Sequence, residues 1–262
     1  RSNVCSRVVA ATGAPISQAA EIYRLATLRR GTQNVATGQT TRHASRRLPG
    51  RAAHHVEQPV NRTDRACLPS VQISDLRKSF RRSIALDGVS LTFSPGVTAL
   101  VGPNGAGKTT LMRTLAGALV PTSGRVRIAG LDPYAKADRR TALAGVSWMP
   151  QIAELPKGMR TIDLVAYLCW MRGQSRGRAL ASAEESLRAV GLTKSFHVKM
   201  GALSGGMVRR VWVAQALAAD ADVLLLDEPS TGLDPRQRET MVRLIRETAA
   251  GTVLLSSHLL ED

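Results

Sequence analysis

The fold of this chain is decided by the stretch Gly102-Pro-Asn-Gly-Ala-Gly-Lys-Thr-Thr110, which fits the pattern G-x-x-x-x-G-K-[ST] at every fixed position. Residues 97–101 before it are apolar and rich in β-branched side chains, as in a buried parallel strand. Residues 108–119 after it read as a helix. A strand, a glycine-rich turn and a helix in this order predict a loop that binds the phosphates of a nucleoside triphosphate, and they disfavour an ordinary glycine turn.

The residue types of this loop suit phosphate chemistry. Its glycines let the backbone wrap closely around phosphate oxygens, where N–H groups and the helix dipole favour an anion. Lys108 is expected to reach the β and γ phosphates, and Thr109 is expected to place its hydroxyl on Mg²⁺. The nucleotide-binding residues predicted in the loop are Gly102, Asn104, Gly105, Gly107, Lys108, Thr109 and Thr110.

A second apolar run, at residues 223–226, ends in the carboxylate pair Asp227 and Glu228 before Pro229. Burying an unpaired charge is costly, so an apolar strand does not carry such a pair without a reason. Asp227 is expected to serve Mg²⁺ through a bound water, and Glu228 is expected to polarise the attacking water. A carboxylate pair that merely starts a helix before Pro229 is the weaker reading.

Between these two strands, Leu-Ser-Gly-Gly-Met at residues 203–207 opens an Ala-rich stretch. A Ser-Gly-Gly turn before a helix predicts a second anion site, with the hydroxyl and two glycine N–H groups as donors. Taken alone, such a turn is more typical of a plain helix N-cap. Arg209 and Arg210 after it are interpreted as a solvated helix face.

The order of these motifs resembles the ATP-binding cassette (ABC) family of ATPases over residues 71–262. The matching segments are the Walker A loop at 102–110, the Q-loop residue Gln151, the signature motif at 203–207, the Walker B strand at 224–228, the D-loop at 230–234 and the switch histidine His258. Met207 replaces the usual signature Gln, as in export-type bacterial members. Phe80 stands where a Tyr usually stacks on adenine, although a strand-end core residue is the alternative reading.

The resemblance implies an α/β fold, a phosphate-loop NTPase (ABC ATPase) core with a helical subdomain and an N-terminal antiparallel β lobe. The helical subdomain would span about 152–200, with helices near 162–172 and 179–190. A coupling helix of a membrane subunit would dock on this lobe. The ABC domain would be residues 71–262, and we expect it to be truncated at its C-terminal end, because the strands that close the sheet after the switch histidine are missing.

The resemblance also implies a composite ATP site. The Walker motifs of one subunit meet the signature loop of another in a head-to-tail dimer. The dimer would be two copies of this chain or this chain with a paralogue; we favour the homodimer, which the complete set of catalytic residues permits. The catalytic residues would be Glu228 as the base, with His258 and Gln151. Mg²⁺ would be held by Thr109, Gln151 and Asp227, and the γ-phosphate of the partner's ATP by Ser204, Gly205 and Gly206.

Composition bounds the setting of the protein. Cys5, Cys67 and Cys169 are far apart and show neither metal-ligand spacing nor a secreted disulfide framework, so a reducing cytoplasm is expected. No apolar run approaches the roughly 18 to 20 residues that cross a bilayer. The pore would then be a separate membrane permease or lie beyond residue 262. We expect the chain at the cytoplasmic side of the cell membrane, held peripherally by that permease.

Residues 1–70 form a basic extension with eleven Arg, no Lys and three acidic residues, which together carry half of the net charge of +16. Little periodic apolar pattern is present there, so disorder is predicted. An arginine-rich arm that contacts anionic lipid or nucleic acid, or a transit peptide, are two further readings. We favour a third, in which the natural start lies near Val71 and the extension is not part of the working protein.

The sequence therefore predicts the ATP-hydrolysing subunit of an ABC membrane transporter of the export type. The alternative is a soluble ABC-type ATPase that acts on ribosomes or DNA, for which the basic charge is a weak argument. No sustained heptads lie between the Walker A loop and the signature, as the DNA-repair branch would require. A non-enzymatic binding module is disfavoured by Lys108, Asp227, Glu228 and His258, and no specific nucleic-acid partner is expected.

Overall fold

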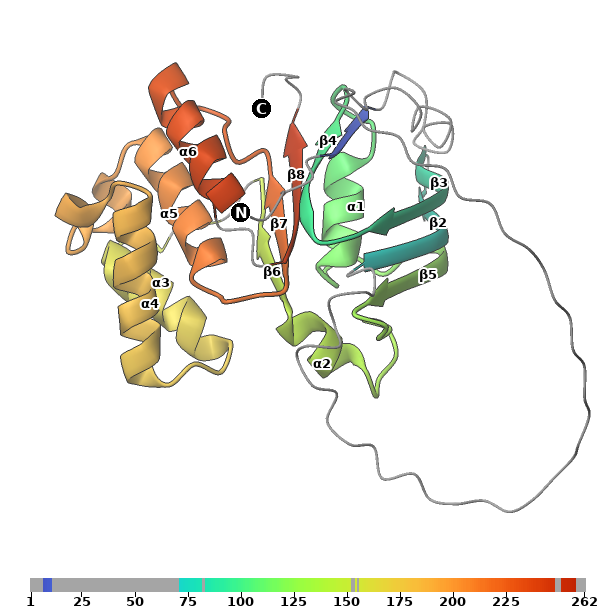
Figure 1. The fold of residues 1–262 in the computed structure, drawn as a ribbon, viewed down its shortest axis with the longest axis horizontal. Helices are drawn as coiled ribbons and strands as arrows, with labels where there is room; N and C mark the ends of the chain where they lie inside the picture. The colour runs from blue at the N-terminus through green and yellow to red at the C-terminus, as the bar shows by residue number, and fades with distance from the viewer. Residues whose placement is uncertain are drawn as a thin grey trace, which may run out of the picture.

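The computed structural model describes residues 71–81, 83–151, 154, 156–247 and 251–257, together with the backbone of residues 7–10. These residues form two sheets, with helix α1 (Lys108–Leu115) between them and the other large helices on the far side of the larger sheet (Figure 1). The architecture agrees with the predicted phosphate-loop core, antiparallel β lobe and helical subdomain.

The larger sheet is parallel throughout. Its five strands lie in the order β1-β4-β8-β7-β6, so β8 separates the strand before the glycine-rich loop from the strand that ends in the carboxylate pair. The bounds are β1 (Arg7–Ala10), β4 (Gly96–Val101), β6 (Val146–Met149), β7 (Val223–Asp227) and β8 (Thr252–Ser257).

The central strands read as continuous apolar runs because both of their faces are covered. Along β7, Val223 and Leu225 belong to the core shared with α1, whereas Leu224 and Leu226 belong to the core shared with the other helices. Every residue of β7 and β8 is buried. The predicted strands at 97–101 and 223–227 are thus both present.

The antiparallel lobe consists of three strands in the order β3-β2-β5. Val71, Ile73 and Leu76 of the central strand are buried in one core with Leu111 and Met112 of α1. The lobe therefore braces the helix that follows the glycine-rich loop. The bounds are β2 (Val71–Phe80), β3 (Ser83–Phe93) and β5 (Ser123–Ile128).

The other face of the parallel sheet carries the larger helical core (Figure 1). Its fourth helix begins at Arg176, three residues before the predicted start at 179, because the Ser175 side chain caps it by accepting a hydrogen bond from the Arg178 N–H. The helix bounds are α2 (Arg139–Ala144), α3 (Thr161–Met171), α4 (Arg176–Ala189), α5 (Gly205–Leu217) and α6 (Pro235–Glu247), with 3₁₀ turns at Thr193–Ser195 and Met200–Ala202.

Helix α1 ends at Leu115, so the prediction that it continues to residue 119 was wrong. Gly117 adopts a left-handed φ of 68° and its N–H bonds to the Thr114 carbonyl, which ends the helix. A Cβ at Gly117 would lie 2.7 Å from Leu143 Cδ1, so the close packing of α2 favours glycine there. The Tyr134 hydroxyl also donates to the Thr114 carbonyl.

Strand β1 is the one described part of the predicted N-terminal extension. Residues 7–10 pair in parallel with residues 98–101 at the edge of β4, which differs from the disorder expected over residues 1–70. Parallel pairing supplies hydrogen bonds for an otherwise open strand edge. The rest of the extension lies outside the described residues.

Replacement of Leu225 by Ala should lower the free energy of unfolding by about 2–5 kcal/mol, because it leaves a cavity at the centre of β7. Leu225 has no exposed surface, whereas Ile84 on β3 is 63% exposed. Urea unfolding followed by circular dichroism measures the change. Ile84→Ala is the control and should cost less than about 1 kcal/mol. Equal losses for the two variants would contradict the assignment of Leu225 to the core.

Candidate nucleotide-binding and catalytic site

The glycine-rich loop joins the end of β4 to the start of α1, as predicted. Gly105 and Gly107 adopt left-handed φ angles of 83° and 91°, which an L side chain would strain. Because of this turn, the N–H groups at the start of α1, which have no acceptor within the helix, point out of the loop together with the positive end of the helix dipole. The geometry forms a cradle for an anion.

The Lys108 ammonium lies over its own loop. Its Nζ donates to the Gly102 carbonyl and, at 3.0 Å, to the Pro103 carbonyl. Burial lowers the pKa of Lys108, whereas the nearby charges of Glu228 and Asp227 raise it. The structure thus brings together three of the predicted functional groups, the loop lysine and both carboxylates.

Asp227 is completely buried at the end of β7. Its Oδ1 accepts a hydrogen bond from the Ser256 hydroxyl on β8, and its Oδ2 has no hydrogen-bond partner among the described residues. A buried carboxylate oxygen without a partner is unstable unless a cation or water satisfies it. The Asp227 carboxylate therefore fits the requirements of Mg²⁺, which prefers oxygen ligands, whereas Thr109 and Gln151 as further ligands remain predictions.

Glu228 occupies a backbone conformation that is rare for its residue type. Its φ is +54°, which costs a non-glycine residue about 1–3 kcal/mol. The side chain is only 8% exposed, and its Oε2 accepts a hydrogen bond of 3.1 Å from the Thr231 hydroxyl. Such strain persists where surrounding contacts hold the backbone in place. One such contact is the hydrogen bond of 2.9 Å from the Glu228 N–H to Ser256 Oγ.

Two residues of this site were missed by the sequence reasoning. Ser256 sits in an apolar strand, and nothing in its spacing singles it out. Arg209 was read as part of a solvated face, but this was wrong, because its guanidinium donates to the backbone carbonyls of Gln151, Asp227 and Glu228. Arg210 likewise donates to the Val190 carbonyl at 3.2 Å.

The signature motif lies at the N-terminus of α5. Ser204 caps this helix, since its hydroxyl accepts from the Met207 N–H at 3.3 Å. A Cβ on Gly206 would lie 3.5 Å from the Gly232 carbonyl of the predicted D-loop. Helices α5 and α1 lie on opposite faces of the parallel sheet (Figure 1). Within one chain, the helix after the glycine-rich loop and the helix after the signature motif thus lie on different faces of the parallel sheet.

The remaining predicted residues are Phe80, Gln151 and His258. Phe80 ends β2 and is 47% exposed, with the Lys78 ammonium 5.4 Å from its ring centroid, so the core-residue reading is not supported. Stacking of Phe80 on adenine remains a prediction. Gln151 is exposed after β6, and the catalytic and Mg²⁺-binding roles of its side chain remain predictions. His258 lies outside the described residues.

The described residues contain neither a cluster of metal-binding side chains nor a membrane-spanning helix. No group of three or more His, Cys, Asp or Glu side chains there is placed to hold a metal ion without further ligands. Among the same residues, none of the helices is long and apolar enough to cross a membrane.

A phosphate-binding loop between a parallel strand and a helix, beside a buried carboxylate pair at the end of a nearby parallel strand, defines a phosphate-loop NTPase. The chain belongs to the ABC transporter family, whose model matches residues 86–231. The resemblance seen in the order of the motifs is thereby confirmed.

Several relatives and solved structures are similar to this chain. Nod factor export ATP-binding protein I of Paraburkholderia xenovorans is 34% identical over 74% of this chain and 64% of its own length. Fe(3+) ions import ATP-binding protein FbpC of Rhizobium etli is 42% identical over 68% of this chain and 50% of its own length. The chain thus spans between half and about two thirds of these relatives.

Among solved structures, the ATP-binding cassette MJ0796, a dimer in a post-hydrolysis state bound to ADP and Pi, matches with a TM-score of 0.66. The match has 23% sequence identity and covers 73% of this chain and 89% of that one. An ATP-binding subunit of an ABC transporter matches with a TM-score of 0.65, 23% identity and coverage of 73% and 80%. At this identity, both likenesses confirm the fold.

Ser256→Ala should lower the free energy of unfolding by about 1–3 kcal/mol, because it leaves the buried Glu228 N–H without its acceptor. Thr252→Val is the matched control on the same strand. The Thr252 hydroxyl is buried without a partner among the described residues, so its removal should be neutral or stabilising. Urea unfolding compares the two variants, and an equal or larger loss for Thr252→Val would contradict the role of Ser256.

Proposed function

We propose that this chain is the ATP-binding and ATP-hydrolysing subunit of an ABC transporter, which powers movement of a substrate through a separate membrane permease. The observation that carries the proposal is the electrostatic grouping of Lys108 with the buried pair Asp227 and Glu228. A loop that cradles phosphate next to such a pair suits hydrolysis of the γ-phosphate, because catalysis of phosphoryl transfer rests on positioning and charge stabilisation.

We assign the residue roles as follows. The loop glycines, Lys108 and Thr110 would hold the phosphates of ATP, and Phe80 would stack on the base. Mg²⁺ supplies charge neutralisation at the β and γ phosphates when it is bound, and Thr109, Gln151 and Asp227 would hold it. Glu228 would act as the base that takes a proton from the attacking water. His258 and Gln151 would be the other catalytic residues.

The working unit we propose is a homodimer. Ser204, Gly205 and Gly206 lie at the start of α5, across the sheet from α1, so they would clamp an ATP held by a second copy. An exposed helix N-terminus with a serine cap is suited to an anion. Support also comes from the related fold of MJ0796, which was solved as a dimer.

The permease would dock on α3. Tyr167, Trp170 and Met171 are 45%, 56% and 63% exposed, and the two aromatic rings lie 6.1 Å apart between centroids. Exposed apolar groups gathered in this way are typical of a protein-interaction surface. This contact would hold the chain at the cytoplasmic side of the cell membrane.

For the direction of transport we propose export. The support is Met207 in the signature motif, which is similar to export-type bacterial members, and the likeness to the Nod factor exporters. The iron-import relatives of comparable identity argue the other way. A flux assay in membrane vesicles of known orientation distinguishes the two directions.

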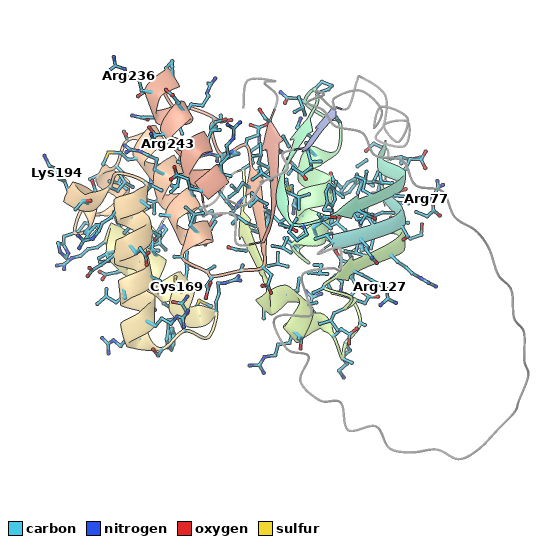
Figure 2. The ribbon with its side chains drawn as sticks, viewed as in Figure 1. Arg77, Arg127, Cys169, Lys194, Arg236 and Arg243 are labelled. Atoms are coloured by element: carbon cyan, nitrogen blue, oxygen red, sulfur yellow. The ribbon has the colours of Figure 1, made fainter. Side chains whose placement is uncertain are left out.

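The alternative, an ATPase that acts on ribosomes or DNA, calls for a gathered basic face. Figure 2 shows instead that Arg77 and Arg127 project from the antiparallel lobe, whereas Arg236 and Arg243 project from α6 on the other side of the molecule. These charges do not form one surface. The transporter reading is therefore preferred.

Glu228→Gln should keep ATP binding but lower the hydrolysis rate by about 10²- to 10⁴-fold, because the amide cannot take the proton of the attacking water. The unhydrolysed ATP should hold two copies together. Phosphate release measures the rate, and light scattering after size exclusion measures the dimer. Lys108→Ala is the control and should lose both ATP binding and the dimer. Hydrolysis by Glu228→Gln at the wild-type rate would refute the role of Glu228 as the base.

Trp170→Glu should weaken membrane association about tenfold or more, because it places a charge in the proposed docking surface. The measurement is the fraction of chain that sediments with membranes from cells that naturally make it. Ile84→Glu on the antiparallel lobe is the matched control, since Ile84 is 63% exposed but lies on β3. Equal sedimentation of the two variants would place the docking surface elsewhere.

A further inference from the structure

One guanidinium joins three separate segments of this chain. Arg209 Nη1 donates to the Gln151 carbonyl at 2.7 Å, and Nη2 donates to the Asp227 carbonyl at 2.7 Å and to the Glu228 carbonyl. Gln151 follows β6 and begins the connection to α3. Asp227 and Glu228 are the last residue of β7 and the first residue of the turn after it.

The three carbonyls lie at or beyond the ends of their strands, where the ladder supplies fewer donors. At residue 228 the backbone turns to a φ of +54°, and the Glu228 carbonyl also accepts a hydrogen bond of 3.3 Å from the Thr231 N–H. Buried carbonyls require hydrogen-bond partners. Arginine is suited to this position because its planar fork serves several acceptors at once and stays charged.

Because Arg209 lies on α5, its hydrogen bonds connect this helix to the turn after β7. It lies on the same helix that Ser204 caps, within the first turns after the signature motif. Arg209 lies five residues after Ser204, which corresponds to about 7.5 Å of helix rise. A displacement of about 1 Å along the bond direction lengthens a 2.7 Å hydrogen bond beyond the range in which it holds.

We infer that Arg209 is a positioning residue that couples the signature end of α5 to the catalytic turn of the same chain. The inference rests on the proposed function. ATP of the partner, bound at Ser204 to Gly206, would fix α5, and through Arg209 would fix the carbonyls that set the conformation of Glu228. Binding of ATP at one site would thus set the conformation of the catalytic base at the other site.

The electrostatics support this arrangement. Burial lowers the pKa of Arg209, whereas the charges of Glu228 and Asp227 raise it. The guanidinium therefore lies in the same field as the two carboxylates and offsets their charge. The bond to Gln151 extends the link toward α3, which carries the exposed Tyr167 and Trp170.

The test compares steady-state ATP hydrolysis by the full chain with the variants Arg209→Met and Arg209→Lys. For the wild type, the Hill coefficient for ATP should approach about two, the number of sites in the dimer. For both variants it should fall to about one, with kcat reduced at least about tenfold, as expected when a catalytic group is misplaced. Affinity for an ATP analogue without Mg²⁺ should stay within about threefold, since Arg209 does not touch the loop.

Arg209→Lys keeps the charge and the aliphatic stem. If Arg209→Met lowers the melting temperature, the result for Arg209→Lys decides the test. A lysine cannot serve the three carbonyls with one compact ammonium. Arg210→Met is the matched control, because Arg210 is the next residue on α5 and donates to the Val190 carbonyl rather than to the catalytic turn. Its Hill coefficient should stay at the wild-type value.

Three outcomes would overturn the inference. A Hill coefficient unchanged in both Arg209 variants would show that the contact is only structural. An equal fall in Arg210→Met would show that any loss of packing on α5 has the same effect. A wild-type chain that binds ATP but does not hydrolyse it would refute the proposed function itself, and the coupling with it.

Discussion

The burial of two adjacent carboxylates at the end of β7 is the constraint on which the rest of the site depends. Asp227 and Glu228 end a strand whose every other residue is apolar. Their desolvation is offset by the Ser256 hydroxyl, the Thr231 hydroxyl and the charges of Lys108 and Arg209. These partners come from β8, the turn after β7, the phosphate loop and α5. The desolvation of one carboxylate pair is therefore offset by contacts from four segments.

The parallel sheet divides the chemistry between its two faces. Helix α1, which follows the phosphate loop, shares a core with the antiparallel lobe, whereas the signature helix α5 shares a core with α3, α4 and α6. An ATP site built from both motifs is therefore incomplete within one chain. At the end of β7, the Arg209 side chain of α5 donates to the carbonyls of Asp227 and Glu228, so a residue from the helical face reaches the turn that carries the two carboxylates.

Much of this arrangement could be predicted from sequence, because the decisive signals are local. The phosphate loop is specified by its own glycines, and the strand before Asp227 by its apolar run. Other features depend on tertiary contacts. The end of α1 is set by Gly117 against Leu143 of α2, and Arg209 is half-buried against turns that lie far away in the chain. No sequence pattern singles out Ser256 within its apolar strand. The role of His258 as the switch histidine remains a prediction.

Glu228 shows that stability and chemistry favour different residues at one position. Glycine or asparagine would adopt its left-handed φ of 54° with less strain. Substitution by either would relax the backbone while removing the carboxylate. Under the proposed role of Glu228 as the base, the strained backbone is kept because the reaction needs a carboxylate there, at the expense of the relaxed conformation that glycine or asparagine would allow.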